Sequence, residues 1–150
     1  MKRMVSALVA GLTICSLAAS FCSEGYGQTL SKPVTPMRIT VKGKGKTTVF
    51  ELNNSQAARD LYAQLPLRIK VENYSSNEKI FYPTKKLRTA DTPSADAQPG
   101  TLAYYAPWGD VVMFFDRFEA AAGLYELGRA VSGGEHIPGM SGTIEIEQGQ

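Results

Sequence analysis

Apolar residues at every second position recur in several short segments after residue 36, and this pattern constrains the fold most. Met37, Ile39 and Val41 alternate with polar residues, and the same alternation recurs at 67–71 and 143–147. Successive side chains of a strand point to opposite faces, so these segments predict β-strands with one buried face. The sequence therefore predicts a mainly β domain.

Two turn sequences predict hairpins. GKGK at 43–46 joins the first strand to an alternating segment at 47–52. APWGD at 106–110 contains a proline and a glycine suited to a turn, and VVMFF at 111–115 follows it. An apolar run without alternation predicts a strand that is buried on both faces, between a barrel interior and a layer packed outside it.

One short helix is predicted after the first hairpin. Asn53, with Gln56 three positions later, resembles a capping box, and Pro66 ends the pattern. Its apolar residues recur on one side of the helix: Ala57, Ala58, Leu61, Tyr62 and Leu65. This stripe predicts a helix that covers an opening in the sheet.

The second half of the chain contains a loop and two further strands. The stretch 89–100 has no apolar period and predicts a long surface loop, either a loose connector or a lid. Residues 125–131 are a weaker strand candidate. The strand at 143–147 is expected to pair with the first strand and thereby remove an open sheet edge.

The N-terminal segment has a different character. Lys2 and Arg3 precede an apolar run and then small residues, which is the layout of a secretory signal peptide over residues 1–27. Cleavage after Ser20 or Gly27 fits this layout. The run is shorter than the roughly 20 residues that a permanent membrane-spanning helix needs. We therefore predict export to the periplasm or the extracellular space.

The exported part is predicted to begin with a flexible tether at 28–36, followed by the β domain at 37–150. Both cysteines, Cys15 and Cys22, lie before the tether, so an internal disulfide is excluded. Cys22 is also a candidate for lipidation, although Phe21 precedes it where lipoprotein signals carry a small residue. Such a lipid would be the domain's one route to a membrane.

Charge excludes one class of partner. From Gln28 onward, 14 Lys and Arg stand against 13 Asp and Glu, so the exported part is almost neutral. Nucleic-acid binding normally requires a strongly basic surface, and we predict no nucleic-acid partner.

The stretch GTLAYYAPWGDVVMFF, followed by YELGRAVSGGEHI and GTIEIE, resembles the bacterial cyclophilin-like family of small uncharacterised domains. The resemblance spans 37–147 and rests on a diffuse set of residues: Tyr104, Tyr105, Pro107, Trp108, Gly109, Leu127, Gly128 and Gly133. It implies a closed cyclophilin-like β-barrel of about eight strands with one short capping helix.

Catalytic residues do not follow from this resemblance. True cyclophilins are peptidyl-prolyl isomerases that place an arginine beside a hydrophobic proline pocket. Their F-M-x-Q-G-G-D segment has no counterpart in this chain, so the catalytic residues stay unknown. A shared barrel alone is weak evidence for isomerisation.

Three residues are candidates for ligand binding. Tyr105 and Trp108 would offer stacking surfaces, because a large aromatic at a turn tip is a typical contact residue, and Arg129 would act as a charge clamp. Met113 and Phe114 are expected in the core, and alternation prevents the four residues of this hairpin from all facing one pocket: Tyr105, Trp108, Met113 and Phe114. We predict a non-enzymatic binding module for a peptide or small molecule.

Two other functions stay open. A peptidyl-prolyl isomerase with an altered site would use Arg129 as the donor to the prolyl nitrogen. A structural or assembly role in the cell envelope is the third possibility. His136 is the only histidine and no cysteine follows residue 27, so we predict neither a metal site nor a cofactor.

Overall fold

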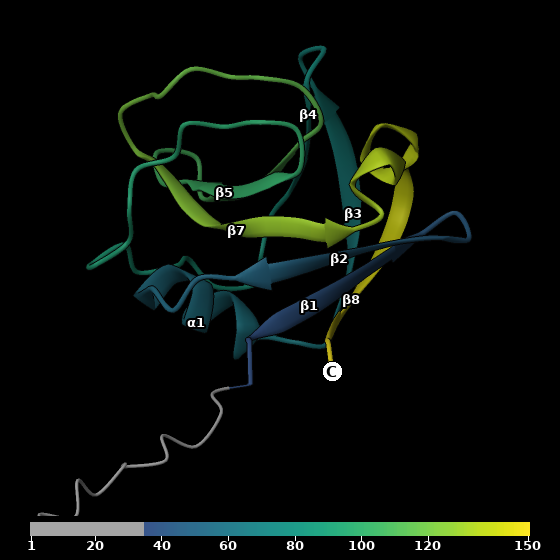
Figure 1. Ribbon diagram of the computed structural model, residues 1–150, viewed down its shortest axis with the longest axis horizontal. Coiled ribbons are helices and arrows are strands. Elements are labelled where there is room, and N and C mark those ends of the chain that lie inside the picture. The colour runs from purple at the N-terminus through teal and green to yellow at the C-terminus, as the bar shows by residue number, and fades with distance from the viewer. Residues whose placement is uncertain (1–34) are drawn as a thin grey trace, which may run out of the picture. The chain divides into compact units, whose positions relative to one another are not determined.

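Eight antiparallel strands close into a barrel in the computed structural model, which describes residues 35–150 (Figure 1). The strand order around the barrel is β1-β2-β7-β5-β6-β4-β3-β8, and β8 returns to β1. The strands are β1 (Arg38–Gly43), β2 (Lys46–Leu52), β3 (Leu67–Tyr74), β4 (Glu78–Phe81), β5 (Thr101–Tyr105), β6 (Asp110–Phe114), β7 (Leu124–Ser132) and β8 (Gly142–Gln148).

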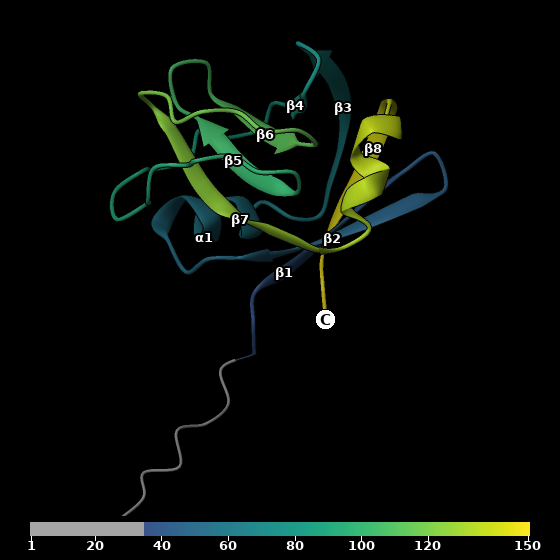
Figure 2. The same ribbon diagram turned by 45° about the horizontal axis from the view of Figure 1, so that its top comes forward.

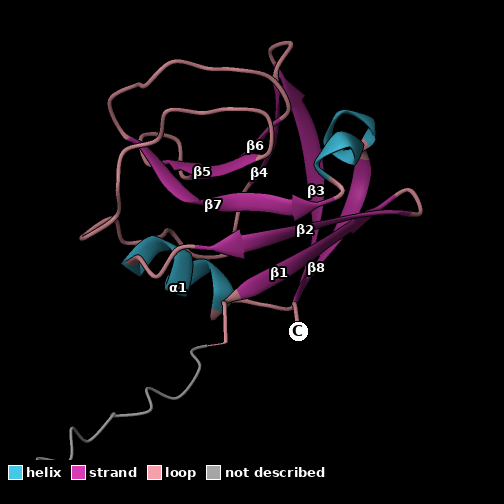
Figure 3. Cartoon of the chain, viewed as in Figure 1, coloured by secondary structure: helices cyan, strands magenta, loops and turns pink. Residues whose placement is uncertain are grey.

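The predicted mainly β fold and closed barrel are confirmed. Figure 3 shows that helix is confined, within this part of the chain, to α1 (Gln56–Tyr62) and the short 3₁₀ helix η1 (Gly134–Gly139). The predicted signal peptide at 1–27 and most of the tether lie outside the described residues. No helix in the described part is long and apolar enough to cross a membrane.

The last strand closes the barrel. β8 pairs with β1, with Ile146 opposite Val41, as the alternation predicted. It also pairs with β3 on its other side, with Ile144 opposite Ile69. β8 therefore lies between two strands and leaves neither of its edges open.

β7, the weaker strand candidate, joins two parts of the barrel. Its Gly128 lies opposite Leu52 of β2 and also opposite Leu102 of β5. A Cβ atom on Gly128 would lie 2.1 Å from the Glu51 carbonyl oxygen and 2.8 Å from the Leu52 Cα. Only glycine allows the backbones of β2 and β7 to approach this closely.

The helix closes one end of the barrel, below β2 and β7 in Figure 1. Ala57, Ala58 and Leu61 are fully buried and belong to the same hydrophobic cluster as the inward residues of the strands. The predicted stripe is therefore core. It contacts the barrel interior rather than a partner.

The helix begins later than the capping box predicted. Ser55 is the N-cap, and its Oγ accepts a hydrogen bond from the Ala58 amide at 3.4 Å. Asn53 instead accepts a hydrogen bond from the Ser55 amide, while its own amide group donates to the Glu126 carbonyl at 2.6 Å. Asn53 thus ties the entry of the helix to β7, which is why it does not act as the cap.

β6 is buried on both faces, as its unbroken apolar sequence predicted. Met113 belongs to the cluster inside the barrel, whereas its neighbour Phe114 belongs to a second cluster outside it. Figure 2 shows β5, β6 and β7 side by side on one wall. The second cluster covers the outer surface of that wall.

The stretch 89–100 is a surface loop without helix or strand, as predicted, but it is held against this outer layer and is therefore not a loose connector. Ala95 and Ala97 are buried, and the Ala95 amide donates to the Leu124 carbonyl at 3.0 Å. The Pro93 carbonyl accepts from the Glu126 amide at 2.8 Å. Small side chains allow this stretch to lie flat against β7, although they give it no apolar period.

The close approach at Gly128 gives a first prediction. Gly128→Ala should lower the free energy of unfolding by about 1–3 kcal/mol or more, because the added methyl overlaps backbone atoms that cannot move independently. The matched control is Gly139→Ala, where no atom lies within 4 Å of the added Cβ and φ is not positive. Urea unfolding of the three proteins measures the difference. Equal effects of the two substitutions would contradict this account of β7.

Candidate functional site

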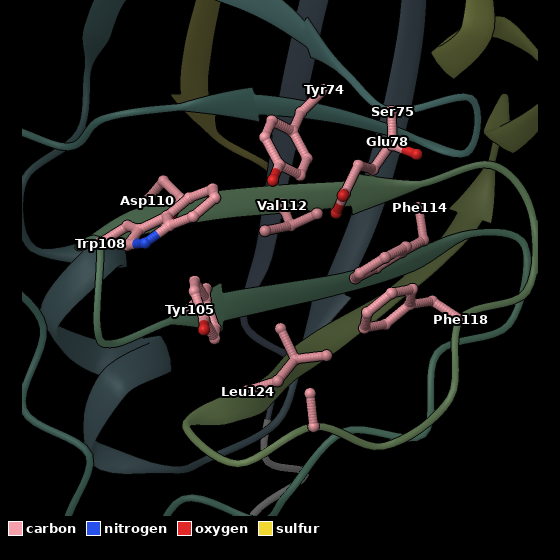
Figure 4. Close-up of a pocket in the computed structure, with 11 residues that line it drawn as sticks. Tyr74, Ser75, Glu78, Tyr105, Trp108, Asp110, Val112, Phe114, Phe118 and Leu124 are labelled. Atoms are coloured by element: carbon pink, nitrogen blue, oxygen red, sulfur yellow. The ribbon is translucent and has the colours of Figure 1, made fainter.

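A cavity of about 270 Å³ lies against the outer face of β6 (Figure 4). Alternate residues of β6 form its base, because Asp110, Val112 and Phe114 point to the same side of the strand. The other lining residues come from β3, β4, β5, β7 and the segments beside them: Tyr74, Ser75, Glu78, Tyr105, Trp108, Phe118, Ala121 and Leu124.

Aromatic rings form one side of the cavity. The Trp108 ring centre lies 5.1 Å from that of Tyr74 and 5.3 Å from that of Tyr105. Both tyrosine rings are nearly perpendicular to the indole, at 82° and 81°. Edge-to-face contacts of this kind are favourable, so the three rings support one another.

A second aromatic pair lies at the other end. Phe114 and Phe118 stack with ring centres 5.6 Å apart and 19° between their planes. Trp108 is 49% exposed, Tyr74 43% and Phe118 38%. Large aromatic side chains therefore surround the opening, where solvent reaches them.

Two carboxyl groups are buried in this apolar setting. Glu78 is 7% exposed and Asp110 2% exposed, and the Oδ1 atom of Asp110 has no hydrogen-bond partner among the described residues. Figure 4 shows the Glu78 carboxyl directed into the cavity, between Tyr74 and Phe114.

Burial changes the acidity of both groups. Loss of solvation, with a smaller effect from the charge of Asp110, raises the pKa of Glu78 from 4.5 to about 7. Burial also raises the pKa of Asp110, although its own backbone amide partly opposes that rise. Near neutral pH, Glu78 therefore exchanges readily between its neutral and charged forms.

Two of the three residues predicted from sequence line this cavity. Tyr105 ends β5 and Trp108 occupies the following turn, so the hairpin brings them together. The turn depends on Gly109, which has a φ of 78°. Met113 and Phe114 are both fully buried in hydrophobic clusters, as expected, but on opposite sides of β6, and Phe114 also lines the cavity.

Arg129 lies elsewhere. It is on β7, five residues after Leu124, which corresponds to about 16 Å along a strand. Its Nε and Nη2 atoms donate to the carboxylate of Glu126 at 3.2 and 3.1 Å. The structure therefore does not bring Arg129 together with Trp108. Trp108 lies in the turn after Tyr105, which pairs with Leu124, whereas Arg129 pairs with Thr101 at the other end of β5.

Sequence reasoning missed Tyr74, Glu78 and Asp110. Asp110 directly precedes the apolar run VVMFF and is the first residue of β6, and this position could have indicated a buried carboxyl. Glu78 lies two residues before Ile80 and therefore on the same face of β4. This spacing could have indicated that the Glu78 side chain is buried. Its place opposite Phe114 depends on the pairing of β4 with β6, which the local sequence does not specify.

The described residues that line the cavity include none of the side chains that usually bind a metal through nitrogen or sulfur, or that bind an anion. Among the described residues that line it, none is a histidine, cysteine, lysine or arginine. The His136 ring is held in another part of the barrel, with its Nδ1 atom 2.8 Å from the Thr47 carbonyl. Within 35–150, no group of three or more potential ligands is positioned to bind a metal ion.

A family comparison agrees with this architecture. The sequence model described as the Cyclophilin-like family matches residues 39–147, which extend from β1 to β8. The chain belongs to the Cyclophilin-like family. The resemblance inferred from the Tyr105–Trp108 hairpin and from Gly128 and Gly133 is thereby confirmed.

A solved structure resembles this cyclophilin-like domain. It is the solution structure of a hypothetical protein from Archaeoglobus fulgidus, with a TM-score of 0.59 and 17% sequence identity. The similarity covers 80% of this chain and 100% of that chain. At this identity it shows a shared fold alone. No curated protein matches the sequence.

The buried Glu78 gives a second prediction. Between pH 4.5 and about 7 the folded domain binds this proton more tightly than the unfolded chain does, so the free energy of unfolding should fall as pH rises through that window. Glu78→Gln should make the decline shallower, while Asp110 still contributes to it. Urea unfolding at several pH values measures the slope.

The control for this prediction is Glu119→Gln, which removes an exposed carboxyl. This variant should keep the slope of the unchanged protein. If Glu78→Gln leaves the slope unchanged as well, Glu78 does not have a raised pKa in the folded state.

Proposed function

We propose that this cyclophilin-like domain is a non-enzymatic binding module that takes a small molecule or a peptide side chain into the cavity beside the 104–110 hairpin. The observation that carries the proposal is the ring of partly exposed aromatic side chains around a cavity with two buried carboxyls. Ligand sites are typically concave, mostly apolar and equipped with a few polar groups that orient the ligand.

The aromatic side chains supply the reason for binding. Trp108, Tyr74 and Phe118 each leave more than a third of their surface in water, although they are large and apolar. A ligand that covers them removes this area from solvent, at about 25 cal/mol per Å². The edge-to-face contacts of Trp108 hold the rings in place before binding, which reduces the entropic cost.

Prolyl isomerisation has less support as an alternative. Lowering its barrier requires an apolar pocket together with a donor to the prolyl nitrogen, and the donor expected from sequence was Arg129. That guanidinium is engaged by Glu126 and does not line the cavity. A structural or assembly role would instead place another protein over the aromatic opening.

Export completes the proposal. The layout of residues 1–27 favours delivery to the periplasm or the extracellular space, and Cys22 is a candidate for lipid attachment there. In that setting the domain would capture a ligand outside the cytoplasm.

Trp108 gives a direct test, because it is the only tryptophan in the chain and its fluorescence reports on the cavity alone. Titration with benzyl alcohol and cyclohexanol should change its emission saturably, with dissociation constants in roughly the millimolar range expected of such small ligands. Ala121→Leu, which fills part of the cavity, should weaken binding about tenfold by steric exclusion.

Ala63→Leu provides the matched control, because it adds the same bulk at an exposed position outside the cavity. Its titration curve should coincide with that of the unchanged protein. Emission changes that do not saturate, or that survive Ala121→Leu undiminished, would count against a binding cavity here.

The isomerase alternative makes a different prediction. NMR exchange spectroscopy of a short peptide with an Ala-Pro bond should show the same cis/trans exchange rate with and without the protein, since no arginine lines the cavity. Faster exchange that disappears in Ala121→Leu would establish an isomerase at this site. Faster exchange that disappears in Arg129→Ala would instead place the isomerase site at Arg129 on β7.

A further inference from the structure

The base of the cavity carries a carboxyl that lacks a partner. Asp110 is the first residue of β6 and pairs with Tyr105 of β5. Only 2% of its surface is exposed to water. Its Oδ1 atom receives no hydrogen bond from any described residue. A buried carboxylate with one oxygen unpaired and no counter-charge is destabilising, so a stable arrangement requires either a proton or a group from outside.

The domain supplies no cation to this carboxyl. The ion pairs found in residues 35–150 engage other acids, and none includes Asp110 or Glu78. Lys79 follows Glu78, but its Nζ atom donates to the Asn73 side chain on the other side of the strand. Asp110 and Glu78 both line the cavity, and neither forms an ion pair with a described residue.

The aromatic side chains beside Asp110 suit a cation. Tyr74 and Tyr105 are nearly perpendicular to Trp108 and within 5.3 Å of it, so ring surfaces with different orientations border the same space. The faces of aromatic rings carry partial negative charge, and boxes of such rings bind ammonium groups, with Trp the most favourable member.

We propose that the cavity binds an organic cation, an amine or a quaternary ammonium compound, with its charged group among Tyr74, Tyr105 and Trp108 and with Asp110 and Glu78 as counter-ions. This inference rests on the proposed binding function and names the class of its ligand. The apolar end at Phe114 and Phe118 would hold the uncharged part of the molecule.

Other classes of ligand fit the site less well. An anion would meet two carboxyls and no basic side chain. A neutral apolar ligand would exclude water from Asp110 and leave its carboxylate unpaired. A small divalent ion requires several oxygen ligands together, and the described residues offer no such group.

A matched pair of probes tests the charge alone. Choline and 3,3-dimethylbutan-1-ol have the same shape, but choline carries a positive nitrogen where the alcohol carries a carbon. Amide shifts in ¹H–¹⁵N NMR spectra of the ¹⁵N-labelled protein at about pH 8, where Glu78 is mostly ionised, report binding. We expect choline to bind about tenfold more tightly or better, through cation–π contact and the counter-ions.

Asp110→Asn removes the charge with little change in shape. Choline should bind about tenfold more weakly to this variant, whereas the alcohol should keep its affinity. Asp116→Asn makes the same chemical change at an exposed position next to β6 and should leave both affinities within about twofold. Both variants should fold, because Asp110 donates or accepts nothing that holds another side chain.

The variant Trp108→Leu tests the cation–π contribution independently of Asp110. Leucine keeps an apolar side chain at this half-exposed position but removes the π surface, so choline should lose its advantage over the alcohol. A loss of packing alone would weaken both probes equally and leave their ratio unchanged.

The outcomes separate this inference from the binding function itself. Selective choline binding that requires Asp110 and Trp108 supports it. Equal binding of both probes, or binding of benzyl alcohol without choline, overturns the cation inference while the binding module stands. Failure of choline, its isostere, benzyl alcohol and cyclohexanol to bind overturns both.

Discussion

Burial of β6 on both faces connects the barrel to its candidate site. Val111 and Met113 point into the barrel core, and the alternate residues Asp110, Val112 and Phe114 point outward to the cavity. One strand therefore packs the interior and forms the base of the site. Because side chains alternate strictly along a strand, a shift of one residue in its register would exchange core and cavity residues. The position of the site is thus determined by the same packing that closes the barrel.

Local patterns in the sequence were sufficient for most of the barrel. Alternation identified the first, third and last strands, and the run VVMFF identified a strand with two buried faces. The hairpin that carries Tyr105 and Trp108 was also local, since a proline and a glycine in five residues specify the turn. These features depend on neighbours in sequence, and they were predicted correctly.

The missed features depend on contacts between distant residues. Glu78 reaches the cavity because β4 pairs with β6. Arg129 misses it because the pairing of β7 with β5 places it opposite Thr101, at the far end of β5 from Tyr105. The stretch 89–100 has no period of its own because the wall that it covers, rather than its own sequence, gives it order. The places of Tyr74 and Glu78 in the site therefore required the strand order, which local patterns do not contain.

The pairing of β1 with β8 places the two ends of the barrel domain next to each other, with Ile39 opposite Gln148. Tyr74, at the opposite end of β3 from the Leu67–Ile146 pair, borders the cavity well away from that edge. Joined ends and a remote opening are the conditions under which circular permutation and insertion into another protein succeed. The barrel can therefore be placed within a host chain while its single tryptophan, Trp108, stays exposed at the cavity.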